Sequence, residues 1–169
     1  MTAPFRVEVL AEHDRTGFGC GEEVLDRYLK TLVTQDVRRH ITNCFVAVEV
    51  ATGGVAGFYT IAATSIATPD LPAELTKRLP RYPTLPGVRI GRLAVDQRFG
   101  GRGLGGALLM DAANRALRSE VVAYAMVVDA KNEQAVMFYE HHGFRRFESR
   151  PGTLFLPLTT AAKALARGA

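Results

Sequence analysis

The chain has 169 residues, which corresponds to about one domain of roughly 100–200 residues. Apolar residues make up 47% and charged residues 22%, values close to those of globular proteins, so collagen-like, disulfide-framework and strongly disordered classes are excluded. The net charge is +4, and 17 of the 21 basic residues are arginines. Arginine suits bidentate phosphate binding, whereas codon usage in a GC-rich genome is the simpler explanation of the skew, and both interpretations stay open here.

The first residues and the cysteines exclude several classes of protein. The segment MTAPFRVEVLAEHD lacks the apolar core of a signal peptide, and no window approaches the roughly 18 apolar residues of a membrane helix. We therefore expect a cytoplasmic protein. Cys20 and Cys44 lie 24 residues apart, and the four histidines are scattered, so we expect two reduced thiols and no metal site.

Apolar patterns predict three strands and a helix in the first part of the chain. Residues 5–10 alternate as a half-buried strand does, and residues 22–40 carry the apolar stripe of one helix. Residues 43–50 and 55–66 are apolar runs joined by Thr52-Gly53-Gly54, which predicts a hairpin. The helical stripe consists of Val24, Leu25, Tyr28, Leu29, Leu32 and Val33.

A short helix and a proline-rich connection are expected next. Asp70 can cap a helix over residues 71–79, with Pro72 in its first turn. Residues 80–87 contain three prolines and should form an ordered connection.

The second half alternates strands and helices, which indicates an α/β domain. The expected strands are residues 88–95, 121–129, 144–148 and 153–158, and the expected helices are residues 104–118 and 132–142. Gly143 then stands at the C′ position that favours glycine. From Thr159 onward we expect an Ala-rich helical turn or a frayed end. No internal repeat or flexible linker is evident, so we expect one domain over residues 1–169.

The most informative segment is VDQRFGGRGLG at residues 95–105, where a strand runs into a glycine-rich turn that opens a helix. Glycine lets the backbone approach a ligand closely, and the free N–H groups of a helix N-terminus attract anions. Together they favour a pyrophosphate site, to which Arg98 and Arg102 add positive charge. Five glycines among the seven positions 100–106 are costly in backbone entropy unless something uses them.

Other glycine-rich motifs fit less well. A Walker loop needs Lys and Ser/Thr after its last glycine, but Gly106 and Ala107 follow Gly105. The spacing GxGxxG of a dinucleotide fold is present at Gly101, Gly103 and Gly106. That fold, however, needs more chain after the loop than remains here, and several strands precede the loop.

The segment Arg98-x-x-Gly101-x-Gly103 resembles the Q/R-x-x-G-x-G/A acetyl-CoA loop of the GNAT N-acetyltransferases. A second block, Asn132-x-x-Ala135-x-x-Phe138-Tyr139-x-x-x-Gly143-Phe144, resembles the closing motif of the same superfamily. Two motifs in the right order are more specific than either alone. The resemblance implies a GNAT fold, which is a single mixed sheet of about six to seven strands flanked by helices, with a splayed central parallel pair.

Shorter segments are similar to the GNAT toxins of bacterial type II toxin–antitoxin pairs, the TacT and AtaT group. They are FGCG at residues 18–21, LDRYL at 25–29, GFYT at 57–60, GRLAVD at 91–96 and VDAK at 128–131. This resemblance implies acetylation of the α-amino group of aminoacyl-tRNA, which blocks translation. It also implies a ribbon-helix-helix antitoxin and a homodimer.

The superfamily resemblance also implies where the acetyl donor, acetyl-CoA, binds. Strands 88–95 and 121–129 would hold it between them, with the backbone of Leu93 and Val95 pairing with the pantetheine amides. Asn132 can cap its helix, contact the cofactor, or do both. The implied cofactor-binding residues are Leu93, Ala94, Val95, Arg98, Gly100, Gly101, Arg102, Gly103, Leu104, Gly105, Gly106, Asn132 and Phe138.

Tyr139 is the candidate catalytic acid, since a phenol with a pKa near 10 can protonate a leaving thiolate. Strand 88–95 contains no carboxylate to act as a base. Deprotonating a lysine at pH 7 costs about 4.6 kcal/mol, against about 1 to 1.4 kcal/mol for an α-amine, so the site favours an α-amine acceptor. Arginines near the site attract a phosphate-bearing substrate. The candidates for tRNA contact are Arg78, Arg81, Arg89 and Arg92.

Two alternatives remain. A GNAT enzyme could acetylate a small-molecule amine or a protein N-terminus, although residues 55–68 offer no acid to attract a cationic amine. A subunit that binds CoA or nucleic acid without activity would be the non-enzymatic alternative.

Overall fold

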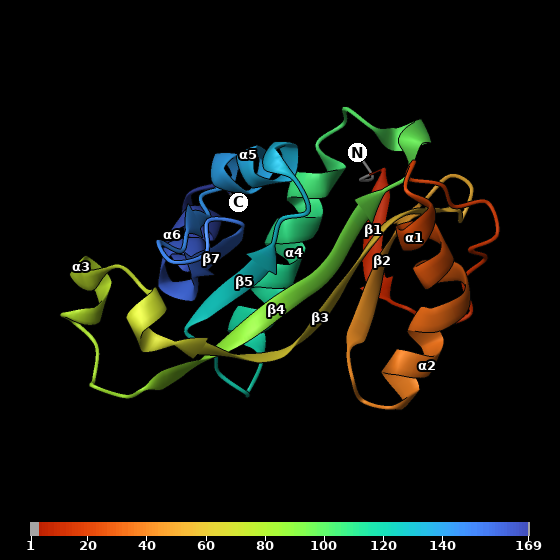
Figure 1. Ribbon diagram of the computed structural model, residues 1–169. Helices are drawn as coiled ribbons and strands as arrows, with labels where there is room; N and C mark the ends of the chain where they lie inside the picture. Colours follow the sequence, from red (N-terminus) through yellow and green to blue (C-terminus); the bar gives the residue numbers. More distant parts are fainter. Residues whose placement is uncertain (1–3, 169) are drawn as a thin grey trace. The chain divides into compact units, whose positions relative to one another are not determined.

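The computed structural model describes residues 4–168, and its hydrogen bonds join seven strands in the order β1-β2-β3-β4-β5-β7-β6 (Figure 1). The pairs β1–β2, β2–β3, β5–β7 and β6–β7 are antiparallel, whereas β4–β5 is parallel. The prediction of a mixed sheet of six to seven strands with a parallel pair is confirmed. The chain divides into two compact units, residues 4–62 with 91–112 and residues 63–90 with 113–168, which are described one at a time.

The first unit holds the N-terminal hairpin and the glycine-rich loop. Its strands are β1 (Phe5–Val9), β2 (Asn43–Glu49), the larger part of β3 (Val55–Ala67) and the end of β4 (Thr84–Val95). Its helices are α1 (Glu23–Arg27), η1 (Tyr28–Leu32), α2 (Val33–Arg38), η3 (Gln97–Phe99) and the first part of α4 (Leu104–Arg118).

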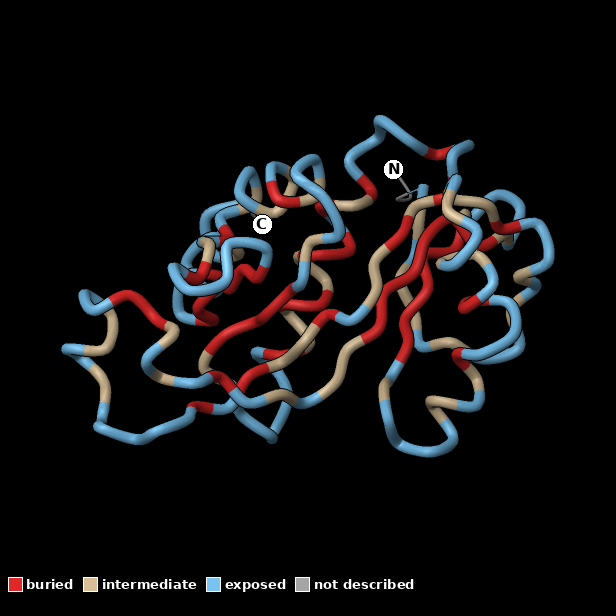
Figure 2. The backbone as a smooth tube through the Cα atoms, viewed as in Figure 1, coloured by how far each residue is buried: buried red, intermediate tan, exposed pale blue. Residues whose placement is uncertain are grey.

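Two layers of helices cover the strands of this unit. Even-numbered residues of β2 and β3, such as Val46 and Phe58, pack with Leu29 and Val33 of the first helices in one apolar cluster. On the opposite face, the Tyr59 hydroxyl donates a 2.6 Å hydrogen bond to Asp111 of α4. Residues 44–48 of β2 are therefore buried on both faces, which explains their continuous apolar run (Figure 2).

The helix expected over residues 22–40 is interrupted by a π-helical turn at Tyr28–Leu32. The prediction of one regular stripe was wrong, because Val24 is 80% and Leu32 44% exposed, whereas Leu29 and Val33 are fully buried. A π turn carries more residues than an α turn, so it shifts the register of the buried face. Arg15 binds this segment by donating to the Leu29 carbonyl at 2.9 Å.

The second unit contains the other helices and strands. They are the end of β3, η2 (Thr68–Asp70), α3 (Ala73–Thr76), the start of β4, the end of α4, β5 (Ala125–Asp129), α5 (Glu133–His141), β6 (Arg145–Arg146), β7 (Thr153–Pro157) and α6 (Leu158–Gly168). An apolar cluster gathers Ile66, Leu71, Leu85, Ala125, Val127, Phe147 and Phe155.

Asp70 does not cap the helix that follows it. Helix α3 is shorter than expected and begins after Pro72, which occupies the N-cap position without a side-chain bond. The Asp70 carboxylate instead accepts hydrogen bonds from Ser149 at 3.0 Å and Arg150 at 3.2 Å. A long-range partner has therefore replaced the local cap.

Two strand boundaries differ from the prediction around the parallel pair. Strand β4 begins at Thr84, within the expected connection. Strand β5 begins only at Ala125, and Val121 and Val122 are 79% and 74% exposed. The strand predicted at 121–129 is therefore too long, since only its second half pairs with neighbouring strands.

The C-terminal elements also differ from the prediction. Residues 144–148 form only the two-residue strand β6, and β7 ends at Pro157. Of the two alternatives expected for the tail, the helical one is correct, and α6 extends it to eleven residues, with Leu158 and Ala161 buried on one side. Within the described residues, no helix is long and apolar enough to span a bilayer.

Candidate active site

The glycine-rich loop has the backbone that the sequence predicts for an anion site. Gly101 and Gly103 have φ values of +75° and +77°, in the left-handed region that other residues avoid. A Cβ atom at either position would meet nothing within 4 Å. The loop therefore needs glycine for its backbone shape, and successive N–H groups in such a turn form a concave anion-binding surface.

Helix α4 begins directly after this turn. The Gly103 carbonyl accepts the N–H of Ala107 at 3.1 Å as the first bond of the helix. The N–H groups of the preceding first turn, at Leu104, Gly105 and Gly106, have no carbonyl within the helix to bind. Because α4 runs for fifteen residues, its dipole adds positive potential there. The loop and the helix start thus suit the pyrophosphate of a cofactor such as CoA.

A buried carboxylate holds the beginning of the loop. Asp96 is 2% exposed and accepts the backbone N–H groups of Gly19 at 3.0 Å and Arg98 at 2.9 Å. It also accepts two guanidinium N–H groups of Arg98, at 3.0 and 3.1 Å. Burial by itself would raise the pKa of Asp96, but the hydrogen bonds from Arg98 and Gly19 outweigh burial and hold the pKa below its usual value.

Arg98 and Arg102 lie on the ring of Phe99. Their guanidinium carbons are 5.4 and 5.5 Å from the ring centroid, within the range of a cation–π contact. Arg98 also donates its backbone N–H and part of its guanidinium to the Asp96 carboxylate. Only the remainder of that guanidinium is left for a phosphate.

At the end of β4, alternate residues direct their backbone groups to opposite sides of the strand. Asp96 donates its N–H to Ala56 of β3 at 2.8 Å, so alternate residues toward the N-terminus also direct their backbone toward β3. Leu93 and Val95 have the opposite parity, and their N–H and C=O groups point away from β3. Backbone groups with this orientation can pair with an extended amide-containing ligand.

In the second unit, β4 and β5 pair in parallel over Gly87–Ile90 and Ala125–Val128. Arg89 lies opposite Val127, so Asp129, two residues further along β5, is on the same face. The Arg89 guanidinium forms an ion pair with Asp129, and Thr153 of β7 donates to the same carboxylate at 2.8 Å. Arg89 is therefore neutralised by a carboxylate that our sequence analysis did not assign to the site.

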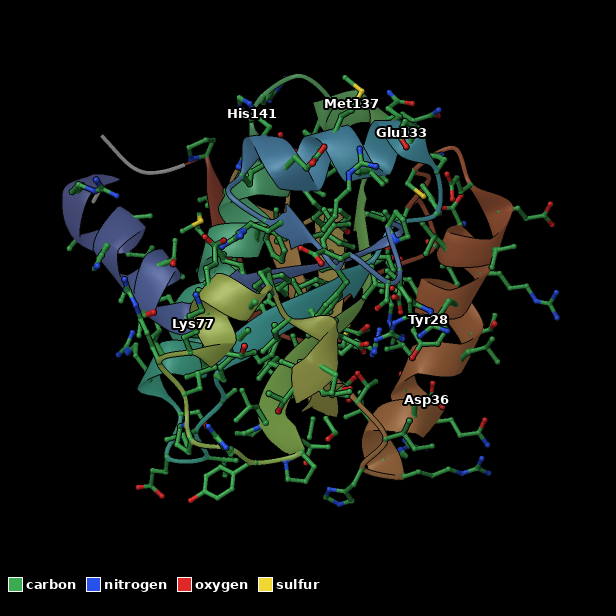
Figure 3. All side chains as sticks on the ribbon, turned by 60° about the vertical axis from the view of Figure 1, so that its left-hand side comes forward. Tyr28, Asp36, Lys77, Glu133, Met137 and His141 are labelled. Atoms are coloured by element: carbon green, nitrogen blue, oxygen red, sulfur yellow. The ribbon has the colours of Figure 1, made fainter. Side chains whose placement is uncertain are left out.

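Helix α5 carries the closing motif. The Asn132 side chain accepts the N–H of Ala135 at 2.8 Å, which confirms its capping role. Gly143 ends the helix with a φ of +93°, as predicted. Figure 3 shows Glu133, Met137 and His141 along one outer face of α5.

Tyr139 lies on α5 beside other aromatic rings. Its ring centroid is 5.3 Å from that of Phe138 and 5.5 Å from that of Phe144. Burial raises the pKa of Tyr139 to about 12. Phe138 packs in turn on His142 at 4.8 Å, so it has a packing role in addition to any contact with a cofactor.

The four arginines expected to contact tRNA have different surroundings. Arg78 and Arg81 are exposed in the segment after α3, and Arg81 lines a cavity of about 830 Å³ with Lys77, Tyr82 and Glu148. Arg89 is paired with Asp129. Arg92 belongs to the first unit and lies over the ring of Tyr28, 3.5 Å from its centroid.

The sequence did not predict the roles of several residues that contact the candidate site residues. Asp96 and Asp129 stood inside recognised motifs but had no assigned role, and Tyr28 was expected only as a core residue. Strand register could have linked Arg89 with Asp129, since both belong to predicted neighbouring strands. Cys20 and Cys44 are both free. Among the described residues, no three His, Cys, Asp or Glu side chains gather in a way that could hold a metal ion.

Comparison with known families gives a match over most of the chain. A model described as Acetyltransferase (GNAT) domain matches residues 40–146. A protein of Mycobacterium tuberculosis described as "tRNA-acetylating toxin" is 35% identical over 154 residues, which are 90% of each chain. "Probable toxin TacT" of Sinorhizobium fredii is 31% identical and covers 88% of this chain and 87% of that protein.

Solved structures give the same fold. A Tyr-to-Phe mutant of KacT has a TM-score of 0.88 at 27% identity, covering 96% of this chain and 99% of that one. AtaT complexed with acetyl-methionyl-tRNAfMet has a TM-score of 0.86 at 28% identity, covering 95% and 99%. An AtaT mutant bound to the C-terminus of its antitoxin AtaR and to acetyl-CoA has a TM-score of 0.80 at 26% identity, covering 96% and 99%.

Proposed function

Because the chain belongs to the GNAT acetyltransferase family, we propose that it is an acetyl-CoA-dependent toxin that acetylates the α-amino group of aminoacyl-tRNA and blocks translation. The observation that carries the proposal is its similarity, over about nine tenths of the chain, to proteins described as tRNA-acetylating toxins. The family model matches residues of both compact units, which supports the proposal of one acetyltransferase domain.

The glycine-rich loop binds the donor in this proposal. The N–H groups of residues 100–106 receive the pyrophosphate, with the remaining charge of Arg98 and Arg102 beside it. The backbone groups of Leu93 and Val95 that point away from β3 receive the pantetheine amides. Acetyl-CoA supplies the thioester whose acetyl group is transferred.

Tyr139 acts as the general acid. The neutral acceptor amine forms a bond with the acetyl carbon while the C–S bond breaks, and the Tyr139 hydroxyl gives its proton to the departing thiolate. The acylated nitrogen loses one proton to solvent, and the phenol regains one from solvent. Burial keeps the phenol protonated well above neutral pH, so the proton is present when the thiolate departs. Among the described residues, no hydrogen bond binds the Tyr139 hydroxyl, so its proton is available for transfer.

The acceptor is inferred from charge and pKa. The strand before the glycine-rich loop contains no acid, and the neighbouring carboxylate of Asp129 is occupied by Arg89 and Thr153. A site without a free base favours an amine that loses its proton near neutral pH, as an α-amine does, over the ε-amine of lysine. Arginines, including Arg92, favour an acceptor that carries phosphates.

The partners follow from the same relatives. AtaT binds the antitoxin AtaR, and KacT occurs with KacA on DNA. We extend this to a ribbon-helix-helix antitoxin that neutralises the present chain, to a homodimer, and to action in the cytoplasm, where charged tRNA is found.

A transfer assay tests the proposal. The protein is incubated with labelled acetyl-CoA and a mixture of charged tRNA, deacylated tRNA and free amino acids. Label on charged tRNA alone is expected, with Tyr139→Phe as the matched inactive control. Label on free amines that is unchanged by tRNA would favour the alternative, a small-molecule or protein N-terminus acetyltransferase. Binding of acetyl-CoA without transfer to any acceptor would indicate a non-enzymatic subunit.

Growth provides an independent test. Induced expression in a bacterium should arrest growth, and Tyr139→Phe should relieve the arrest. Normal growth on expression of the active protein would contradict a toxin.

A further inference from the structure

Arg92 differs from the paired arginines of the chain in how its charge is held. Arg89, Arg98, Arg145 and Arg146 each form an ion pair with a carboxylate. Among the described residues, Arg92 forms no ion pair with a carboxylate. Its guanidinium carbon instead lies 3.5 Å from the centroid of an aromatic ring, and no carboxylate of the described residues pairs with its charge.

The ring under Arg92 is fixed in place. Tyr28 is 3% exposed and lies in the π-helical turn, and its hydroxyl donates a 2.7 Å hydrogen bond to Asp36. Figure 3 shows Tyr28 and Asp36 on the same helical segment. Tyr28 therefore binds the carboxylate of Asp36 with its hydroxyl and the guanidinium of Arg92 with its ring face.

The backbone of Arg92 is also fixed. Its N–H donates to the hydroxyl of Thr60 at 3.0 Å, and Thr60 is buried. A Cβ at the adjacent Gly91 would lie 3.1 Å from that hydroxyl, so glycine leaves room for the bond. Both ends of the Arg92 side chain are therefore held, and little rotamer entropy is left to lose on binding.

Arg92 does not share a face with the helix that opens after the glycine-rich loop. Arg92 and Ala94 have the same parity, and Ala94 packs in the cluster that contains Tyr28 and Phe58. Helix α4 lies on the other face, where a Cβ at Gly57 would meet Leu108 at 3.0 Å. The anion bound by Arg92 is therefore not the one bound at the start of α4.

We infer that Tyr28 is a positioning residue that holds Arg92, unneutralised and pre-oriented, to bind a backbone phosphate of the RNA acceptor. The inference rests on the proposed function and assigns the acceptor phosphate to Arg92 rather than to Arg89, whose charge Asp129 already neutralises. The remaining edge N–H groups of the stacked guanidinium donate to the phosphate oxygens, as arginine does in bidentate phosphate contacts.

Steady-state kinetics with charged tRNA and acetyl-CoA test this inference. Arg92→Ala should raise the KM for charged tRNA by about tenfold to a hundredfold, the range expected for hydrogen bonds to a charged group. Tyr28→Leu should raise the same KM, while the KM for acetyl-CoA and kcat change by less than about twofold. Tyr28→Phe keeps the ring and should restore near-normal values. Arg92→Lys, which leaves Tyr28 untouched, should behave like Arg92→Ala because ammonium cannot stack or bind in a fork.

A double-mutant cycle separates positioning from loss of fold. Tyr28→Leu combined with Arg92→Ala should be no worse for the KM of charged tRNA than Arg92→Ala alone, since Tyr28 acts through Arg92. The slope of log affinity against log salt should fall by about one in Arg92→Ala. Additive effects, or a Tyr28→Leu variant with normal KM, would overturn the inference while leaving transfer to charged tRNA intact.

Failure of the proposed function gives a different result. If the unsubstituted protein transfers no acetyl group to charged tRNA, the proposed reaction is wrong. The binding of deacylated tRNA to the same variants then decides the inference. Weaker binding by Arg92→Ala and Tyr28→Leu, but not by Tyr28→Phe, would uphold it, and equal binding by all of them would overturn it.

Discussion

Tyr139 carries the proton transfer of the proposed reaction, and its aromatic neighbours separate its chemical role from its packing role. Phe138 and Phe144 contact the ring, so removing the hydroxyl alone leaves these contacts in place. A single oxygen atom can therefore be tested without disturbing helix α5.

Tyr139→Phe should reduce kcat by about 10²- to 10⁴-fold, the usual contribution of a general acid. Acetyl-CoA binding and the melting temperature should stay close to those of the unsubstituted protein. Single-turnover transfer to charged tRNA, together with a direct acetyl-CoA titration, measures both. Turnover within about threefold of normal would show that Tyr139 is not the acid.

The pH dependence of transfer should follow the acceptor rather than Tyr139. Since burial raises the pKa of Tyr139 to about 12, the phenol stays protonated across the working range. Transfer should rise as an α-amine with a pKa of about 7.7–8.0 loses its proton, and then stay level up to about pH 9.5. A fall in kcat between pH 8 and 9.5 would contradict the assignment of Tyr139 as acid.

At the scale of elements, the glycine-rich loop and the π-helical turn each depend on backbone geometry more than on side-chain packing. The loop needs left-handed residues that only glycine adopts readily. The π turn moves Val24 and Leu32 out to solvent while Leu29 and Val33 stay buried. Both features have consequences for stability that single substitutions can measure.

Gly101→Ala and Gly103→Ala should each destabilise the fold by about 1–2 kcal/mol, because alanine is strained at positive φ. Both should also raise the KM for acetyl-CoA, since the loop is proposed to hold the pyrophosphate. Gly53→Ala is the matched control: its φ is also +75° with open space around it, but it lies in the turn between β2 and β3. It should lose similar stability and keep the normal KM. An equal change in the KM for acetyl-CoA in all three variants would show that the loop has no specific role in cofactor binding.

Because of the π-helical turn, neighbouring apolar residues of this helix should contribute unequally to stability. Leu29→Ala should lower the free energy of unfolding by about 2–5 kcal/mol, as buried leucine truncations do. Val24→Ala should change it by less than about 0.5 kcal/mol, because surface substitutions have little effect. Urea denaturation measures both values. Similar losses of unfolding free energy in both variants would instead support the regular apolar stripe predicted from the sequence.

Much of the architecture could be predicted because it depends on local patterns. The strand 55–66, the helix 104–118 and the caps at Asn132 and Gly143 follow from periodicity and turn chemistry, and the structure places them within about one residue. The motif residues of the glycine-rich loop and α5 also occupy the expected elements.

The errors come from tertiary partners that a linear pattern does not contain. Asp70 binds Arg150, about eighty residues away, in place of capping α3. The apolar Val121 and Val122 lie outside the strand that they were expected to begin. The neutralisation of Arg89 and the stacking of Arg92 on Tyr28 also depend on neighbours distant in sequence. Local patterns therefore predict which elements carry the motif residues, but not which arginines pair with a carboxylate.

At the scale of the whole molecule, positive charge is a poor guide to ligand binding. The net charge is +4, yet carboxylates neutralise several of the arginines. Asp96 is the buried member of this set and connects the glycine-rich loop to Gly19. Acid conditions that protonate Asp96 should therefore lower the free energy of unfolding.

The free energy of unfolding should fall in acid, and Asp96→Asn should make this fall smaller. The pKa of Asp96 in the folded protein lies below its unfolded value, so its stabilising contribution is complete above the unfolded pKa of about 3.9. That contribution is lost as the pH falls through the lower, folded pKa. Free energies of unfolding between pH 2 and 7 should show a smaller decline in Asp96→Asn than in the unsubstituted protein. Parallel curves would indicate that other carboxylates dominate acid unfolding.

The backbone at Gly21 also restricts how this sequence can evolve. Gly21 has a φ of +94°, and a Cβ there would lie 2.6 Å from the Gln97 side-chain nitrogen. Gln97 in turn donates its backbone N–H to Gly19 at 2.9 Å. A larger residue at position 21 is therefore strained by this left-handed backbone, whichever residue stands at position 97. Sequences that share the fold should keep glycine at position 21, or the asparagine or aspartate that tolerate this region.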